Sequence, residues 1–206
     1  MMNKRHTLAV IAGEQGGYFT AQQALSAGYS YRVQHYHTQT GDWIREGRGI
    51  YRLRDYPLPC RPDLIALTLL SNDRSGEPHA VVSHETALTI YELSDANPER
   101  IHITVPVSFR KEMPAGVIIH RGRLTGSDWE QFEGYRVTTP LRTIVDIAGS
   151  PSGWPYLADA VYDALRKGMV RSTQLLLAEG SEQTKAWIHS ALQAAEQRAR
   201  RTRVSL

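Results

Sequence analysis

The sequence lacks most features that mark exported, membrane-spanning or catalytic proteins. Its single cysteine, Cys60, allows no internal disulfide. No charged start leads into an apolar h-region and no apolar run is long enough to span a bilayer, so the cytoplasm is the expected compartment. Walker loops, GxSxG elbows, dinucleotide fingerprints and HExxH motifs are also missing. We therefore expect no cofactor, no metal and no enzyme activity.

Lysine is scarce, and its positions argue against a nuclease. A restriction-endonuclease-like metal site needs an acid followed by an acid-x-Lys element, but none of the residues two positions ahead of a lysine is a carboxylate. The four lysines are Lys4, Lys111, Lys167 and Lys185, preceded at that spacing by Met2, Phe109, Leu165 and Gln183. A nuclease with a degenerate site stays only as a second alternative.

Arginine is abundant, making up 20 of the 24 cationic residues, and the formal net charge is +3. Residues 1–56 contain seven Lys or Arg and four acids, residues 57–150 contain nine and twelve, and residues 151–206 contain eight and five. Two basic ends therefore flank an acidic middle. The planar arginine fork suits phosphate, although a GC-rich codon bias would give the same Arg-to-Lys ratio without any function.

A proline-rich break separates the first segment from the rest. YPLPCRP, residues 56–62, has three prolines in six positions and cannot lie inside regular structure. We predict a winged helix-turn-helix domain at residues 1–56, a mixed α/β domain at 57–150 and a helical C-terminal extension at 151–206 that packs on it. The predicted fold class is α+β.

The first segment has helix boundaries at short intervals. A first helix around Leu8 should end before the Gly16-Gly17 pair, and Thr20 with Gln23 forms a capping-box pattern that starts a second helix. This helix should end at Gly28, and Ser30 can cap a third helix that runs to Gly41. Two helices joined by a tight turn and followed by a hairpin indicate a winged helix-turn-helix.

The third helix has a polar side suited to reading base edges. At 100° per residue, Val33, Tyr36, His37 and Thr40 fall on one side, which we expect to face inward. Arginine can form paired hydrogen bonds with guanine, and glutamine with adenine. A plain solvated helix face is the alternative. The residues that we predict to read bases are Tyr31, Arg32, Gln34, His35 and Thr38.

The hairpin EGRGIYRLR, residues 46–54, is the candidate wing. Gly47 and Gly49 allow a tight turn around Arg48, and the returning strand alternates apolar and arginine side chains. Arginines on a wing bind phosphates next to the helix that reads bases. A charged edge strand that resists aggregation would look similar. The predicted phosphate contacts are Arg45, Arg48, Arg52 and Arg54.

The middle segment alternates helices and strands. Strand patterns occur at residues 99–106 and 116–121, after a helix that Ser83 can cap. A further helix should start with Thr139 as N-cap and Pro140 at its first position, with Gly149 past its end. Helices then continue from Trp154, over Ser172–Glu179 and from Ala186 toward the C-terminus.

Three histidines of this segment, His84, His102 and His120, could converge. Because no close-spaced ligand motif accompanies them and Cys60 has no cysteine partner, we favour satisfied core or surface histidines over a zinc site. Arg142 is placed to pair with a nearby acid or to extend into a partner site, and we favour the structural role.

The order of several short segments resembles the AbiEi-type antitoxins of type IV toxin–antitoxin and abortive-infection systems, which act in phage defence. The resemblance covers roughly residues 5–150. Its segments are SHETAL at 83–88, RIHITVP at 100–106, GVIIHR at 116–121, GYRVTTP at 134–140, RT at 142–143 and DIA at 146–148. It implies a winged helix that represses transcription of its own operon, and a following domain needed to neutralise a nucleotidyltransferase-like toxin.

We expect two partners, the double-stranded DNA of its own operator and such a toxin. The chain could bind repeats cooperatively as a monomer, but the sequence leaves the oligomeric state open. The main alternative is a winged-helix regulator whose acidic α/β domain senses a small molecule and which has no toxin partner.

Overall fold

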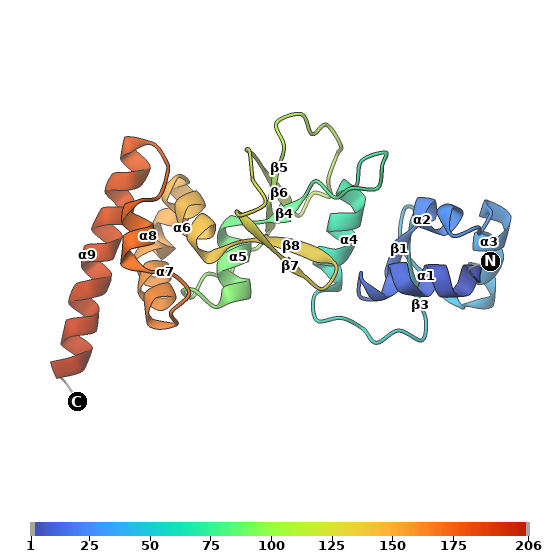
Figure 1. Ribbon diagram of the computed structural model, residues 1–206, viewed down its shortest axis with the longest axis horizontal. Coiled ribbons are helices and arrows are strands. Elements are labelled where there is room, and N and C mark those ends of the chain that lie inside the picture. The colour runs from blue at the N-terminus through green and yellow to red at the C-terminus, as the bar shows by residue number, and fades with distance from the viewer. Residues whose placement is uncertain (1–2, 205–206) are drawn as a thin grey trace. The chain divides into compact units, whose positions relative to one another are not determined.

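A computed structural model describes residues 3–204, with side chains as far as Arg201. These residues fold into two compact units (Figure 1). The first comprises the chain up to residue 80 with residues 108–113 and 131–136, and the second comprises the rest. No described helix is long and apolar enough to cross a membrane. The predicted α+β class is confirmed, whereas the domain boundaries at 57 and 151 stay predictions.

The first unit begins with a winged helix-turn-helix, as predicted. Three short helices precede a hairpin, and the hairpin joins a third strand to form a small sheet of order β1-β3-β2. The elements are α1 (Lys4–Gly13), β1 (Tyr18–Thr20), α2 (Ala21–Ser26), α3 (Tyr31–Thr40), β2 (Trp43–Gly47) and β3 (Ile50–Leu53).

The second helix starts where the capping box was predicted. Thr20 Oγ1 accepts a hydrogen bond from the Gln23 N–H at 3.1 Å, and Gln23 Oε1 accepts one from the Thr20 N–H at 2.8 Å. Ser30 is the N-cap residue of α3, but its side chain makes no capping bond. Gly41 ends α3 in the left-handed region, with φ of 79°.

Aromatic side chains dominate the core of this winged helix. Phe19 meets Trp43 edge to face, with ring centroids 4.8 Å apart, and stacks on Tyr51 at 5.9 Å. Leu8 and Ala12 of α1 are buried in the same cluster. The strand that carries Phe19, β1, was not predicted because its three residues are too few to show a two-residue period.

The chain after the prolines contributes a further helix to the first unit. Helix α4 (Pro62–Ser71) has a proline at its start, where no backbone N–H is required, and buries most of its side chains. The sequence pattern of residues 56–62 indicates only a break and does not predict this helix. The last proline, Pro62, is the first residue of α4, and the apolar residues that follow it are helical.

The remaining strands form one five-stranded sheet of order β6-β5-β4-β8-β7. β4 pairs antiparallel with β5 and parallel with β8, while β5 and β6 are parallel. The predicted strands at 99–106 and 116–121 are confirmed as β5 and β6, and the other three were not predicted. The strands are β4 (Val81–Val82), β5 (Ile101–Val105), β6 (Val117–Arg121), β7 (Trp129–Phe132) and β8 (Tyr135–Thr138).

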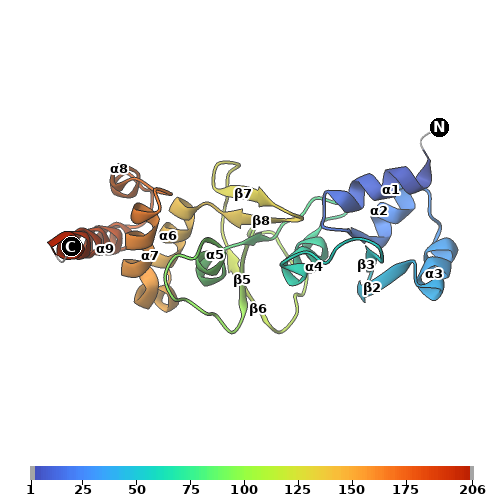
Figure 2. The same ribbon diagram turned by 90° about the horizontal axis from the view of Figure 1, so that it is seen from below.

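Helices make up the rest of the second unit, and Figure 2 shows α6, α7 and α9 side by side. The predicted start of α6 is confirmed, because Thr139 Oγ1 accepts from the Arg142 N–H at 3.3 Å and Pro140 is the first helical residue. Gly149 is its C-cap. The helices are α5 (His84–Tyr91), α6 (Pro140–Ala148), η1 (Pro151–Gly153), α7 (Trp154–Arg166), α8 (Ser172–Leu176) and α9 (Glu182–Val204).

Candidate nucleic-acid interface

The third helix is held against the second by a buried glutamine. Gln34 is 2% exposed, and its side-chain Nε2 donates hydrogen bonds to the carbonyl oxygens of Ala21 at 3.1 Å and Tyr29 at 2.9 Å. These carbonyls lie at the start of α2 and in the turn that connects the two helices. The expectation that Gln34 lies on the outward side and reads a base is therefore wrong. Its amide instead fixes the position of α3.

The burial of Gln34 rotates the helix relative to the predicted faces. Tyr36 is 61% exposed, and Val33 and Thr40 are exposed as well, although all three were expected to face inward. Hydrophobic periodicity assigned these residues to the core because they are more apolar or less charged than their neighbours. Gln34 is buried because its amide donates to backbone carbonyls, and a hydrophobic pattern does not indicate burial of this kind.

The outward face of α3 is polar and aromatic, and it begins at the helix N-terminus. Tyr31 is 66% exposed. Thr38 is half-buried, and its hydroxyl hydrogen is donated to the His35 carbonyl at 2.7 Å. The hydroxyl therefore has no free hydrogen to donate to a base. The sequence pattern placed Tyr36 on the inward side, and it placed Gln39 beside the outward side without including it among the residues that read bases. The exposed side chains that could meet a major groove are Tyr31, Arg32, His35, Tyr36 and Gln39.

The C-terminal end of α3 is anchored by an imidazole. The His37 ring stacks on Trp43 with centroids 4.9 Å apart and an interplanar angle of 17°. His37 Nδ1 lies 3.0 Å from Asp42 Oδ2, and Thr40 donates to the same oxygen at 2.8 Å. Both hydrogen bonds lower the pKa of Asp42, and the bond from His37 has the larger effect. Both ends of the helix are thus tied to the core beneath it.

The hairpin forms a short wing with two exposed arginines, of which Arg45 donates through Nε to the Gly47 carbonyl at 3.4 Å. Gly49 has φ of 72° in the turn, and the strand register shifts between Arg45 and Gly47, which marks a bulge. Arg45 and Arg48 are exposed. No hydrogen bond or ion pair holds the Arg48 side chain within the described residues. Its guanidinium is available to a phosphate.

The other two wing arginines are used within the fold. The Arg52 side chain is 12% exposed, and its Nε donates to Glu46 Oε1 at 2.9 Å. Its guanidinium carbon lies 6.0 Å from the centre of the Tyr18 ring. Arg54 is exposed but donates to the Gly41 carbonyl at the C-terminal end of α3. The interpretation of Arg52 as a free phosphate ligand is therefore wrong.

The three histidines of the second unit converge as the sequence suggested they could. The rings of His84 and His120 stack with centroids 3.4 Å apart. His102 Nδ1 lies 2.8 Å from Glu85 Oε2 and 3.1 Å from His120 Nε2. Within the described part of the chain, no group of three His, Cys, Asp or Glu side chains could hold a metal ion. The cluster belongs to the second unit and not to the winged helix.

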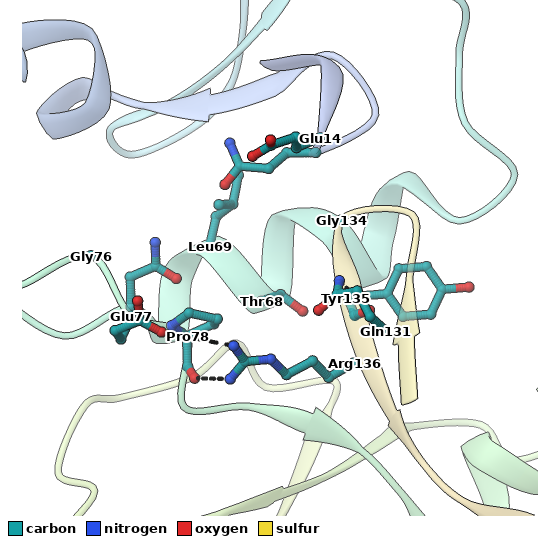
Figure 3. Close-up of a pocket in the computed structure, with 12 residues that line it drawn as sticks. Glu14, Thr68, Leu69, Gly76, Glu77, Pro78, Gln131, Gly134, Tyr135 and Arg136 are labelled. Atoms are coloured by element: carbon teal, nitrogen blue, oxygen red, sulfur yellow. Dashed lines mark hydrogen bonds and ion pairs between the residues drawn. The ribbon is translucent and has the colours of Figure 1, made fainter. Parts of the chain in front are cut away.

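A separate pocket of about 490 Å³ lies in the first unit (Figure 3). The Arg136 side chain donates to the Pro78 carbonyl at 3.2 Å and lies 3.7 Å from Glu77. Glu14, from the end of α1, lies on the opposite side in the view. Because its arginine is already bonded and its other charges are acidic, this pocket does not favour phosphate.

Comparison with known proteins agrees with this architecture. The crystal structure of the Rv2827c protein from Mycobacterium tuberculosis superposes with a TM-score of 0.53 at 14% identity, covering 95% of this chain and 78% of that one, which shows a shared fold. No curated protein sequence matches the chain. The family described as "Transcriptional regulator, AbiEi antitoxin" matches residues 7–54, and the "AbiEi antitoxin C-terminal domain" family matches residues 80–198. The chain therefore belongs to the AbiEi antitoxin family.

Proposed function

We propose that the chain is a transcriptional repressor of its own operon and the antitoxin of a type IV toxin–antitoxin system. One observation carries the repressor part. α3 is anchored from below by Gln34 and His37 while its outer face of arginine, histidine, tyrosine and glutamine stays exposed. A rigid helix with hydrogen-bonding side chains on its free face is what the major groove admits.

The wing supplies the second part of the proposed interface. Arg45 and Arg48 offer their guanidinium groups to phosphates or to the minor groove next to the reading helix. Such contacts add affinity that depends on salt and carries little sequence information. Base reading is thus assigned to α3, with Tyr31, Arg32 and His35 from the sequence pattern, and phosphate binding to the hairpin tip.

The DNA-binding part can be tested on the region upstream of the gene. Arg48→Ala should weaken binding to every DNA sequence and reduce the salt slope by about one unit, because about one phosphate contact is lost. Arg32→Ala should reduce the binding free energy by about 1 to 3 kcal/mol for operators with the preferred base at particular positions, and it should relax the base preference at those positions. Arg74→Ala is the matched control, since it removes an exposed arginine outside the wing. An unchanged slope in the Arg48 variant would contradict the wing assignment.

The antitoxin part rests on family membership, and a nucleotidyltransferase-like toxin is the proposed partner. Co-expression with the adjacent gene should restore growth that the toxin alone arrests. The double variant Arg32→Ala/Arg48→Ala should lose repression and still restore growth, because the second unit is unchanged. Absence of rescue by the unmodified chain would favour the regulator without a toxin partner.

A further inference from the structure

The second unit contains a cavity of about 500 Å³ that the proposed function does not use. Side chains from α5, β6 and α6 line it, among them two histidines, two arginines and an aspartate. Its volume is within the range typical of small-molecule sites. The residues used below are His84, His120, Arg121, Arg142 and Asp146.

The two imidazoles give the cavity a flat, uncharged surface. The His84 and His120 rings are nearly parallel, with an interplanar angle of 11°. His84 adopts φ of 52°, a backbone conformation that is unfavourable for a residue with a side chain. Burial lowers the pKa of His84 to about 3, and it also lowers the pKa of His120. Both rings are therefore neutral at physiological pH and present an aromatic surface.

Asp146 presents an acceptor that the protein leaves unused. Its side chain is 7% exposed, and Oδ1 accepts a hydrogen bond from Arg142 Nε at 2.8 Å. Oδ2 is buried and has no hydrogen-bond partner among the described residues. A buried carboxylate oxygen without a donor is costly, so it points to a ligand that supplies an N–H group.

A free cation stands at the same cavity. Arg121 ends β6 and is exposed, and its side chain has no hydrogen bond or ion pair within the described chain. Arg142 is different, because Asp146 and, at 3.9 Å, Asp128 already balance its charge. The cavity thus combines an unbalanced positive charge at Arg121 with an unsatisfied acceptor at Asp146.

We propose that this cavity binds a nucleotide, with the base beside the His84–His120 pair, an N–H of the base edge on Asp146 Oδ2, and the phosphate on Arg121. An inorganic anion would satisfy Arg121 but would be repelled by Asp146. An uncharged aromatic molecule would leave Arg121 unbalanced. A nucleotide brings a planar ring, an N–H donor and an anion in one molecule, and it can be free or part of a single strand.

Binding of ATP, GTP, CTP and UTP to the full chain, each measured by titration calorimetry, tests the proposal. At least one should bind, and Arg121→Ala and Asp146→Asn should each weaken it about tenfold, equivalent to about 1.4 kcal/mol. Arg123→Ala, which removes an exposed arginine two residues further on and outside the cavity lining, should leave the affinity unchanged. Inorganic triphosphate should bind more weakly than the nucleotide, and Asp146→Asn should not weaken its binding, because that change removes a charge that repels the anion.

The opposite results overturn the proposal. One such result is that none of the four nucleotides binds at millimolar concentration. Another is that the Arg121 and Arg123 variants lose nucleotide affinity equally, and a third is that inorganic triphosphate binds as tightly as the nucleotide. A 5′-phosphorylated single strand of about ten nucleotides distinguishes the source. Tighter binding of the strand that still depends on Arg121 identifies a nucleotide within a strand, whereas preference for the mononucleotide identifies a free one. Arg121 is exposed, so its variant folds whether or not the Asp146 variant does.

Discussion

The assignment of Gln34 as an anchor, and not as a base-reading residue, gives a sharp prediction for Gln34→Met. Methionine keeps the unbranched shape and the helix propensity of glutamine, but it has no N–H donor. The change removes both hydrogen bonds from Nε2 and leaves the carbonyls of Ala21 and Tyr29 without that donor. We expect the winged helix to lose stability while the outer face of α3 keeps its chemistry.

The magnitude follows from the contacts. Each hydrogen bond lost from a buried pair costs about 1 to 3 kcal/mol when its partner stays behind. Two such losses are offset in part, because Gln34 Oε1 is itself buried without a partner and methionine removes that penalty. A net loss of about 1 to 3 kcal/mol remains. Gln39→Met is the matched control, since Gln39 is exposed on the same helix and its replacement should change stability by less than about 0.5 kcal/mol.

Hydrogen exchange of the backbone amides locates the effect. In the Gln34 variant, amides of α2 and α3 should open more easily than in the unmodified chain, while those of β5 and α6 should not change. At low temperature, where most molecules stay folded, the variant should still distinguish the same base pairs. Undiminished protection of α2 and α3 together with a lost base preference would refute the anchor and restore the base-reading interpretation.

The ionisable groups of the second unit predict two opposite responses to pH. The neutral form of His84 is required in the fold, since its pKa falls from 6.5 to about 3, so stability is lost as pH falls below 6.5. Between pH 7 and pH 4.5, urea unfolding should show the unmodified chain losing up to about 3 kcal/mol more than His84→Asn, which tolerates the same φ. Equal losses would contradict the burial of a neutral imidazole. Burial raises the pKa of Asp146 from 3.8 to about 6, despite Arg142, so this group costs stability as pH rises from 3.8 through 6. Asp146→Asn should therefore be more stable than the unmodified chain at pH 7, by at most about 3 kcal/mol, and no more stable at pH 4.

Local chemistry explains which elements the sequence predicted. The box of Thr20 and Gln23 and the Thr139-Pro140 start of α6 fix helix ends through bonds between near neighbours, so both could be identified from residue types alone. β1 and β4 have three and two residues and exist because partner strands from distant parts of the chain pair with them. Short runs of this kind carry no periodic signal.

The candidate site was predictable in its parts and not in its orientation. The order of helix, turn, helix and hairpin placed Arg32 and Arg48 on exposed positions that the structure retains. The buried side of α3 depends on Gln34, whose role follows from two carbonyls brought near it by the turn. A hydrophobic pattern places a glutamine on the solvent side of a helix. Because Gln34 is buried instead, the buried side of α3 differs from the predicted one. Identifying it requires knowing where unpaired backbone groups lie.

Two of the wing arginines hold the hairpin and α3 in place and are not expected to bind phosphate. Arg52 closes the hairpin through Glu46, and Arg54 bonds the last turn of α3 at Gly41. Their removal should lower DNA affinity by loosening the angle between wing and helix, but it should not change the number of phosphates neutralised. We therefore expect Arg52→Ala to weaken operator binding without changing the salt slope, and to lower the melting temperature, whereas Arg48→Ala changes the slope and not the melting temperature. A slope reduced by about one unit in the Arg52 variant would mean that this guanidinium leaves Glu46 and contacts phosphate when DNA is bound.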